Sequence, residues 1–224
     1  LDKSLEKIIP ADLNALNLNQ SKYSFLLNDN GGIIDDLIIT RTDKGFCIIL
    51  NAACKENDVK QISKYLSPDH KNYLNSDLSL IALQGPKAVT ILDKLIPNVS
   101  KLKFMNGGNF KFAGAMIYIT RSGYTGEDGF EISIPNENAE NFINQIFKNE
   151  NALLCGLGCR DSLRVEAGLS LYGNEINEDI TPIQANLSWA LDKKRLEDDN
   201  LNGSSILLKQ LQETKDNIKI GLTP

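Results

Sequence analysis

Carboxylates with aromatic and glycine neighbours are the side chains of this sequence best suited to chemistry. The segment 119–135, ITRSGYTGEDGFEISIP, reads as two strands joined by a turn with a glycine at every third position. Glycine permits positive φ angles and lets the backbone approach a ligand closely. Tyr124, Glu127 and Asp128 lie between the glycines, and Glu131 begins the second strand. The segment is therefore either a long, exposed acidic hairpin or a ligand-binding loop.

A pair of aspartates lies inside an apolar strand, IIDDLIIT, at residues 33–40. Side chains alternate across a strand, so Asp35 shares one face with Ile33, and Asp36 shares the other with Ile34. Both faces are otherwise apolar, so at least one carboxylate is expected to be partly buried. That is costly unless the group is hydrogen-bonded, protonated or functional, and burial raises its pKa toward the acid–base range. The alternative is that both aspartates cap amides at a strand end or bulge.

Arg160 directly precedes a predicted helix, DSLRVEAGLSLYG, at residues 161–173. Asp161 or Ser162 suits the N-terminus of that helix. The helix dipole disfavours a cation at this position, and an anionic partner would offset the cost. The alternative is a surface arginine paired with a neighbouring acid.

The four cysteines and the single histidine do not indicate a metal site or a disulfide scaffold. The cysteines are scattered, and their spacing is not a usual zinc or redox spacing. We expect them to be reduced and mostly buried, as in a cytosolic or matrix protein. His70 lies in the polar run SPDHKN and is expected to be a solvated loop residue, so Cys-His and Ser-His-Asp chemistry find no support. The cysteines are Cys47, Cys54, Cys155 and Cys159.

Composition favours an acidic globular protein. A chain of 224 residues can bury a sizeable core as one large or two small domains. Its 24 Lys and Arg against 29 Asp and Glu give a formal net charge of −5, which argues against non-specific nucleic-acid binding. No apolar run is long enough to span a bilayer, and the N-terminal residues do not read as a signal peptide. Because the chain does not begin with Met, we expect a fragment or a processed form.

Hydrophobic periodicity predicts strands and helices that hold these residues in place. Asp58 or Asn57 is expected to cap a helix that ends at Leu66. A charged linker is expected at 191–203. Strands are predicted at 23–27, 33–40, 46–50, 78–83, twice within 110–120, at 130–134 and at 218–222, and helical segments within 1–18 and at 58–66, 86–96, 136–147, 161–173 and 204–214.

Three segments resemble the aminomethyltransferases, the T-proteins of the glycine cleavage system, whose wider family binds folate. They read NDNGGIIDDLIIT, SGYTGEDGFEISIP and GLGCRDSLRVEAGLSLYGNEINEDITPIQANLSWAL. The shorter segments LNAAC and LQGP lie between them in the family's order, so the resemblance covers nearly the whole chain. The YGNEI, TP and LSW motifs of the third segment are more typical of T-proteins than of distant folate-binding relatives.

The resemblance implies roles for residues that are already unusual on physical grounds. Asp35 corresponds to the family's essential aspartate, which lies beside the folate nitrogens and positions and activates the attacking amine. Glu131 corresponds to a glutamate that accepts two hydrogen bonds from the pterin ring N–H and amino group. The other residues implied to form the folate site are Tyr23, Asn51, Phe104, Tyr124 and Arg160.

The implied reaction takes an aminomethyl group from the lipoyl arm of the glycine cleavage H-protein and gives the one-carbon unit to tetrahydrofolate, with release of ammonia. It relies on proximity and one acid–base carboxylate, without a metal. No nucleic acid or membrane partner is implied, and the expected location is cytoplasmic, or the mitochondrial matrix in a eukaryote. The alternatives are a folate-dependent demethylase of the same superfamily and a non-catalytic folate-binding protein or truncated remnant.

The expected fold is α+β, with antiparallel sheets, helices packed on one face and two subdomains around a folate cleft. Residues 1–191 would form the folate-binding region, with subdomains at roughly 1–75 and 76–191. Residues 192–224 would form a linker and the start of a truncated C-terminal β-barrel domain. The family's N-terminal motifs and most of that barrel do not occur in this sequence, so part of the pocket wall and of the carrier-protein surface is expected to be missing.

Overall fold

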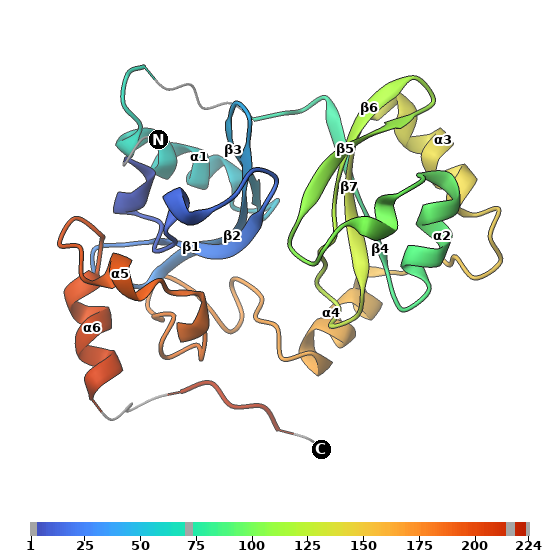
Figure 1. Ribbon diagram of the computed structural model, residues 1–224. Helices are drawn as coiled ribbons and strands as arrows, with labels where there is room; N and C mark the ends of the chain where they lie inside the picture. Colours follow the sequence, from blue (N-terminus) through green and yellow to red (C-terminus); the bar gives the residue numbers. More distant parts are fainter. Residues whose placement is uncertain (1–3, 70–73, 214–217, 223–224) are drawn as a thin grey trace. The chain divides into compact units, whose positions relative to one another are not determined.

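The computed structural model describes residues 4–69, 74–213 and 218–222 (Figure 1). His70, which the sequence analysis expects in a solvated loop, lies outside the described residues. No helix among the described residues is long and apolar enough to cross a membrane. The described residues form two antiparallel sheets and several helices, which confirms the α+β class.

The chain divides into two compact units. The first unit combines Leu1–Leu74 with Ser170–Pro224, and the second unit is Asn75–Leu169. The expected subdomain boundary at residues 75 and 76 lies next to the first division. Residues 192–213 and 218–222, expected as a linker and the start of a C-terminal β domain, belong to the first unit in this division.

The first unit contains a three-stranded antiparallel sheet in the order β1-β2-β3. The Asn-Asp-Asn-Gly-Gly turn joins β1 to β2, and the Asn28 side chain accepts the backbone N–H groups of Asn30 and Gly32 at 2.9 Å each. All three strands lie where the sequence predicts them. They are β1 (Ser21–Leu27), β2 (Ile33–Thr42) and β3 (Gly45–Leu50).

A register shift decides which residues of β2 share a face. Leu26 pairs with Asp35, but Leu27 pairs with Ile33, so Ile34 is an extra residue in β2. Ile34 packs in the same apolar cluster as Leu26, while Ile33 packs in the cluster on the other face. The prediction that Ile33 shares the face of Asp35 is therefore wrong, because the shift puts Ile34 there.

Both faces of this sheet are covered, as the two-sided apolar pattern of β2 predicts. Helix α1 and two 3₁₀ turns cover the face that carries Leu26. The segment 172–191 and helices α5 and α6 cover the other face. The covering elements are η1 (Leu5–Lys7), η2 (Leu13–Ala15), α1 (Lys55–Tyr65), η4 (Ser188–Ala190), α5 (Lys193–Leu196) and α6 (Ser204–Gln212).

Helix α1 begins earlier than predicted, with Cys54 as its N-cap residue. Asp58 therefore lies inside the first turn, so the expectation that it caps the helix is wrong. Asp58 is 0% exposed and Ile62, four residues on, is 3% exposed. Residues four apart share one helix face, so Asp58 points inward with Ile62.

The C-terminal residues differ from the prediction in two places. The predicted linker contains α5, and residues 218–222 lie outside every strand. The backbone N–H of Lys219 donates to Gln184 O at 2.8 Å and its side chain to Ser170 at 2.8 Å, which holds this segment against the loop that follows the second unit. The predicted helix at 204–214 is confirmed as α6.

The second unit contains a four-stranded antiparallel sheet in the order β4-β7-β6-β5. Helices α2 and α3 pack on one face of it (Figure 1), where Leu92 and Phe142 meet Phe130 of β7. The expected packing of helices on one face is thus found in the second unit, whereas helices cover both faces of the sheet in the first unit. The elements are β4 (Leu78–Gln84), α2 (Ala88–Leu95), η3 (Val99–Lys101), β5 (Gly107–Phe112), β6 (Ala115–Thr120), β7 (Gly129–Pro135) and α3 (Asn136–Ile146).

Helix α4 (Leu157–Glu166) begins and ends earlier than the predicted 161–173. Gly168 has φ +72°, its N–H donates to Val165 O, and the N–H of Leu169 donates to Arg164 O. These two bonds form a Schellman motif that ends the helix. Asp161 consequently lies inside the helix and is not its cap.

The cysteines are free, but the expectation that they are mostly buried is wrong. Cys47 is exposed on β3, which lies at the edge of its sheet, and Cys54 is half-buried. Cys155 and Cys159 are exposed at the start of α4.

Candidate functional site

Asp35 is fully buried in β2 and is held by an amide. It is 0% exposed, and the Asn51 side-chain nitrogen donates to its Oδ1 at 2.8 Å. Asn51 directly follows β3, whose last residue pairs with Leu37, so its side chain reaches the two aspartates. The same nitrogen lies 2.7 Å from Asp36 Oδ1. The prediction that β2 buries a carboxylate is confirmed.

Asp36 points to the other face, into an aromatic group. The Tyr23 hydroxyl donates to Asp36 Oδ2 at 2.9 Å. The Tyr23 ring stacks on Trp189 with centroids 5.6 Å apart and meets Phe25 edge-on at 5.1 Å. Burial raises the pKa of Asp36, while the hydrogen bonds from Tyr23 and Asn51 lower it in part. Tyr23, Asn51 and the aspartates thus form one connected group in the first unit.

Asp58 is an acid of this group that sequence reasoning missed as a site residue. Burial, followed by the hydrogen bond and charge of Asp35, raises its pKa to about 8. An aspartate in the first turn of a helix is commonly a cap or a dipole partner, which conceals any other role. The sequence signal that could have identified it is its spacing of four residues from the apolar Ile62, which puts both on one helix face.

The glycine loop of the second unit joins β6 to β7 and is braced by Gln84, the last residue of β4. The Gln84 amide donates to Ser122 O at 3.1 Å and to Phe130 O at 3.2 Å. The Thr125 hydroxyl donates to Gln84 Oε1 at 3.3 Å. One side chain thus ties both ends of the loop and its middle together. It belongs to the LQGP segment.

The three glycines of this loop are required for different structural reasons. A Cβ at Gly123 would lie 1.8 Å from Gln84 Oε1, and a Cβ at Gly129 would lie 2.4 Å from the same side chain. Gly126 has φ +77°, and its Cβ would lie 2.7 Å from Ala167 Cβ. Gly123 and Gly129 therefore make room for Gln84, and Gly126 supplies the left-handed turn.

Glu131 is half-buried in β7, on the face opposite the core residues Phe130 and Ile132. The Ser122 hydroxyl donates to its Oε2 at 2.7 Å and lies 2.8 Å from the Thr120 hydroxyl. In the described part of the chain no hydrogen bond reaches Oε1. The carboxylate is thus oriented and can accept further hydrogen bonds.

Arg160 lies over the ring of Tyr124, with the guanidinium carbon 4.7 Å from the ring centroid. This is a cation–π contact. The adjacent Asp161 pairs with Arg164 at 2.8 Å, and among the described residues Arg160 forms no ion pair. The structure therefore brings together two residues that the sequence analysis assigns to the site. Phe104, on the loop before β5, is 73% exposed.

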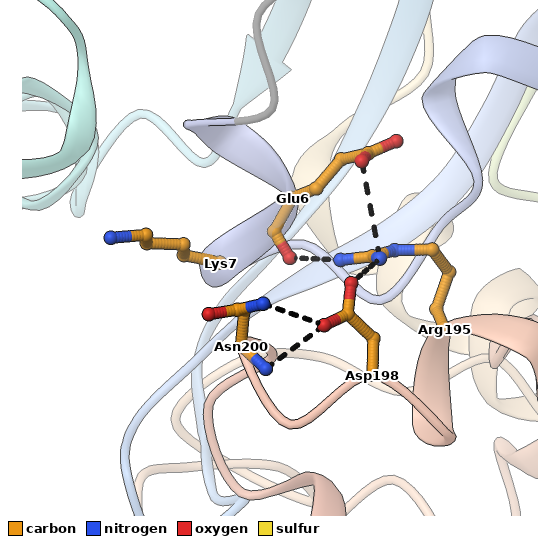
Figure 2. Close-up of a pocket in the computed structure, with 5 residues that line it drawn as sticks. All are labelled: Glu6, Lys7, Arg195, Asp198 and Asn200. Atoms are coloured by element: carbon orange, nitrogen blue, oxygen red, sulfur yellow. Dashed lines mark hydrogen bonds and ion pairs between the residues drawn. The ribbon is translucent and has the colours of Figure 1, made fainter.

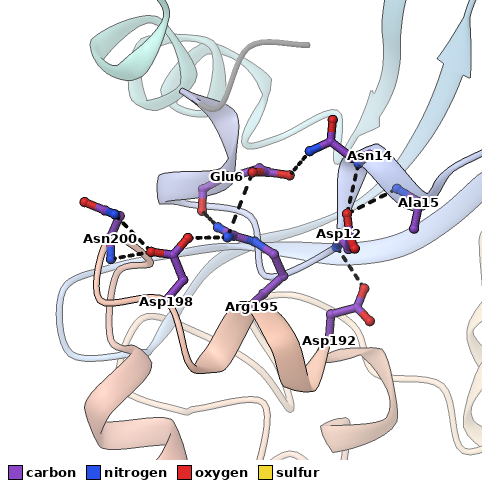
Figure 3. A network of polar contacts seen from close by, with 8 residues as sticks. All are labelled: Glu6, Asp12, Asn14, Ala15, Asp192, Arg195, Asp198 and Asn200. Atoms are coloured by element: carbon purple, nitrogen blue, oxygen red, sulfur yellow. Dashed lines mark hydrogen bonds and ion pairs between the residues drawn. The ribbon is translucent and has the colours of Figure 1, made fainter.

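A hollow of about 270 Å³ lies elsewhere in the first unit and contains none of the predicted site residues (Figure 2). Arg195 approaches Asp198 at 2.5 Å and Glu6 at 3.9 Å, and it donates to the Glu6 backbone oxygen. Figure 3 shows Glu6 bound in turn by the Asn14 side chain, at 3.0 Å. The network ties η1 to α5 and is structural. The hollow is lined by Glu6, Lys7, Arg195, Asp198 and Asn200.

Known proteins resemble this chain along nearly its full length. An aminomethyltransferase, mitochondrial, from Dictyostelium discoideum is 42% identical over 94% of this chain and 56% of its own length. A probable aminomethyltransferase, mitochondrial, from Schizosaccharomyces pombe is 39% identical over 97% of this chain and 57% of its own length. The crystal structure of glycine cleavage system aminomethyltransferase T from Bartonella henselae superposes with a TM-score of 0.86 and 38% identity, covering 95% of this chain and 58% of that one.

The chain thus spans a little more than half the length of these relatives. The family described as the GCVT N-terminal domain matches residues 2–195, which is most of the chain. The match contains both the aspartates of β2 and the glycine loop. This chain belongs to the family of GCVT N-terminal domains.

Proposed function

We propose that this chain carries the aminomethyltransferase activity of the glycine cleavage system. The reaction would move a one-carbon unit from the aminomethyl-dihydrolipoyl arm of the H-protein to tetrahydrofolate and release ammonia. Membership of the GCVT family and the names of the relatives support this assignment. The lipoylated H-protein is the proposed partner.

The observation that carries the proposal is the burial of the Asp35 carboxylate. A fully buried carboxylate in an apolar strand costs stability, and this one lies in a segment that resembles the aminomethyltransferases. Asn51 fixes its Oδ1, so the group has one orientation. We assign to Asp35 the acid–base role toward the amine nitrogen of folate. Such groups contribute typically about 10²–10⁴-fold to a rate.

The residues of the second unit suit recognition of a pterin. Glu131 is oriented by Ser122 and keeps an oxygen for further donors, which fits a ring N–H and an amino group side by side. Tyr124, with Arg160 over its ring, offers an aromatic surface and a cation for a ligand that is aromatic at one end and anionic at the other. We assign these residues to tetrahydrofolate binding.

The remaining predicted residues are assigned supporting roles. Tyr23 and Asn51 hold the aspartates of β2. Phe104 presents an exposed ring that could stack on the ligand. Tetrahydrofolate is the only small molecule that the proposal requires, and no metal takes part. We propose a cytoplasmic location, or the mitochondrial matrix in a eukaryote, and the names of two relatives contain the word mitochondrial.

The proposal is tested by calorimetric titration of the chain with tetrahydrofolate. Replacing Glu131 with Ala removes a charged contact with two donors and should weaken binding by about 10²–10⁴-fold. Glu140→Ala, which removes an exposed acid of α3, is the matched control and should bind like the parent. Equal affinity in Glu131→Ala and the parent would overturn the assignment of Glu131.

Turnover is tested separately with the aminomethylated H-protein as donor and the release of ammonia as the readout. Parent chain that binds tetrahydrofolate and releases ammonia only with this donor supports the proposal. Turnover with a methylated amine in place of the H-protein would assign the chain to folate-dependent demethylation. Folate binding without turnover on any donor would mark a binding protein.

A further inference from the structure

Two carboxyl groups lie buried against each other in the first unit, one on β2 and one on α1. Asp35 and Asp58 are each 0% exposed. No N–H or O–H group of the described residues donates to either oxygen of Asp58 or to Oδ2 of Asp35. Buried polar oxygens are nearly always hydrogen-bonded, so three of them without donors call for an explanation.

The packing of α1 on the sheet brings these groups together. Asp35 pairs with Leu26, and residues directly opposite in a sheet point to the same face. Leu26 and Ile62 belong to one apolar cluster, and Asp58 lies one turn from Ile62 on the inward face of α1. The carboxyl group within hydrogen-bond reach of Asp58 is that of Asp35. Two carboxyl oxygens can form a hydrogen bond only if one of them carries a proton.

The groups around the pair offer no cation to replace that proton. Asp36, next along β2, adds a like charge. Cys54 at the start of α1 and Tyr172 of the segment 172–191 have pKa values raised to about 11 and about 12, so both are neutral near pH 7. Burial is the main cause in each case and the charges of nearby acids add to it, as does, for Cys54, a hydrogen bond of its thiol to Asp35.

Helix α1 also packs on η1, which carries Glu6 and Lys7. Lys7 is exposed, and Glu6 is held by Asn14 and Arg195 (Figure 3). Among the described residues, every charged group that acts on Asp58 is an acid. A proton is therefore the means by which this buried pair avoids two adjacent negative charges.

We propose that Asp58 is a positioning residue that keeps its proton at neutral pH and donates it to Oδ2 of Asp35, so that the pair shares one proton and one negative charge. Asn51 then holds one oxygen of Asp35 and Asp58 holds the other. The raised pKa of Asp58 agrees with this arrangement. The consequence for the reaction, an Asp35 whose two oxygens are both held in place, rests on the proposed aminomethyl transfer, whereas the shared proton does not.

The proton is observed directly by carbon NMR of side-chain carboxyl groups, with ¹³C-labelled aspartate in the chain as it stands and without folate. At pH 7 the parent should show one protonated aspartate carboxyl, which ionises near pH 8. Asp58→Asn should lose that signal, and Glu56→Gln, an exposed change on the same helix, should keep it. A parent without a protonated aspartate at pH 7, or a signal that survives in Asp58→Asn, would overturn the proposal.

Magnesium or calcium titrated into the same sample tests the other way to neutralise the pair. A signal that is unchanged by either ion supports the shared proton. Loss of the protonated signal at neutral pH on addition of either ion, restored by chelation, would show a cation site and overturn the proposal.

The positioning role is read from the pH profile of one-carbon transfer. Asparagine keeps a donor toward Asp35 but cannot ionise, so Asp58→Asn should stay within about tenfold of the parent rate at pH 7 and lose the fall in rate near pH 8. Asp58→Leu, which has no donor, should lose more than the Asn variant does. A parent profile retained in Asp58→Asn would contradict the role. If the parent shows no transfer, the proposed function fails, while the NMR result still decides the shared proton.

Discussion

In the first unit Asp35 is fully buried and faces a second buried acid, whereas in the second unit Glu131 is half-buried and bonded to a serine hydroxyl. Burial away from water changes how tightly a pair of carboxyl groups holds protons, and so does a second acid nearby. A hydroxyl donor on a partly hydrated carboxylate mainly fixes its direction. The first arrangement suits proton transfer and the second suits recognition of a fixed donor pattern.

The two regions also differ in how an amide supports them. Asn51 bonds to the carboxylates themselves, so its loss would leave buried acceptors without a donor. Gln84 bonds to the backbone of the glycine loop and to Thr125, so it shapes the loop that carries the residues proposed to bind the ligand. The proposed reacting group is held directly and the proposed binding group through its loop.

The largest expected effect is on turnover in Asp35→Asn. This change keeps the shape of the side chain and removes its charge, so one-carbon transfer should fall by about 10²–10⁴-fold. Single-turnover ammonia release from aminomethylated H-protein measures it, with circular dichroism as the check on folding. A rate within threefold of the parent would remove Asp35 from the chemistry and break the distinction between the two regions.

The next effect is a loss of stability in the first unit as the pH rises from about 4 to about 8. Asp58 has a folded-state pKa of about 8, above the value of an unfolded aspartate, so the folded state binds its proton more tightly. Its contribution to stability is full below about pH 4 and falls as the pH rises to about 8, by up to about 1 kcal/mol per pH unit.

Urea unfolding of the parent and of Asp58→Asn over this pH range measures that slope as a difference, so that other acids cancel. The free energy of unfolding of the Asn variant should change less with pH. Asp128 of the second unit, whose pKa Arg121 lowers, acts in the opposite direction and loses its contribution only at acid pH. Identical slopes in parent and variant would contradict the buried acid.

A smaller effect sharpens the account of the glycine loop. Gly123→Ala places a methyl group against Gln84 and should lower the free energy of unfolding by about 1–3 kcal/mol. Shortening Gln84 to Ala in the same chain should recover part of the loss. Chemical unfolding of the two single variants and the double variant forms the cycle. Additive losses would show that the clash with Gln84 is not the cause.

The smallest effect concerns the pair formed by the exposed Arg160 and the half-buried Tyr124. Their contact should contribute about 0.5–1 kcal/mol, because water competes for the guanidinium. A double-mutant cycle with Arg160→Gln and Tyr124→Leu measures this coupling in the free energy of unfolding. Tetrahydrofolate affinity measured on the same four chains shows whether the pair serves the ligand as well.

The buried aspartate could be predicted from the sequence, because β2 is otherwise apolar on both of its faces and neither face is suited to solvent. The exchange of Ile33 and Ile34 could not, since the register shift is set by pairing with β1. The reason for Gly123 and Gly129 lies in Gln84, which is far away in the sequence. Asp58 could not be identified as a site residue from the sequence, because an acid is common in the first turn of a helix for other reasons.

Tetrahydrofolate titration of Asp35→Asn beside Glu131→Gln distinguishes a reacting carboxylate from a recognising one. Both changes replace a carboxylate with an amide of the same shape, one in each region. We expect Glu131→Gln to bind tetrahydrofolate at least tenfold more weakly than the parent. Asp35→Asn should bind it within about threefold of the parent and lose turnover. Equal losses of affinity in the two variants, or a loss confined to Asp35→Asn, would contradict the division between a reacting carboxylate and a recognising one.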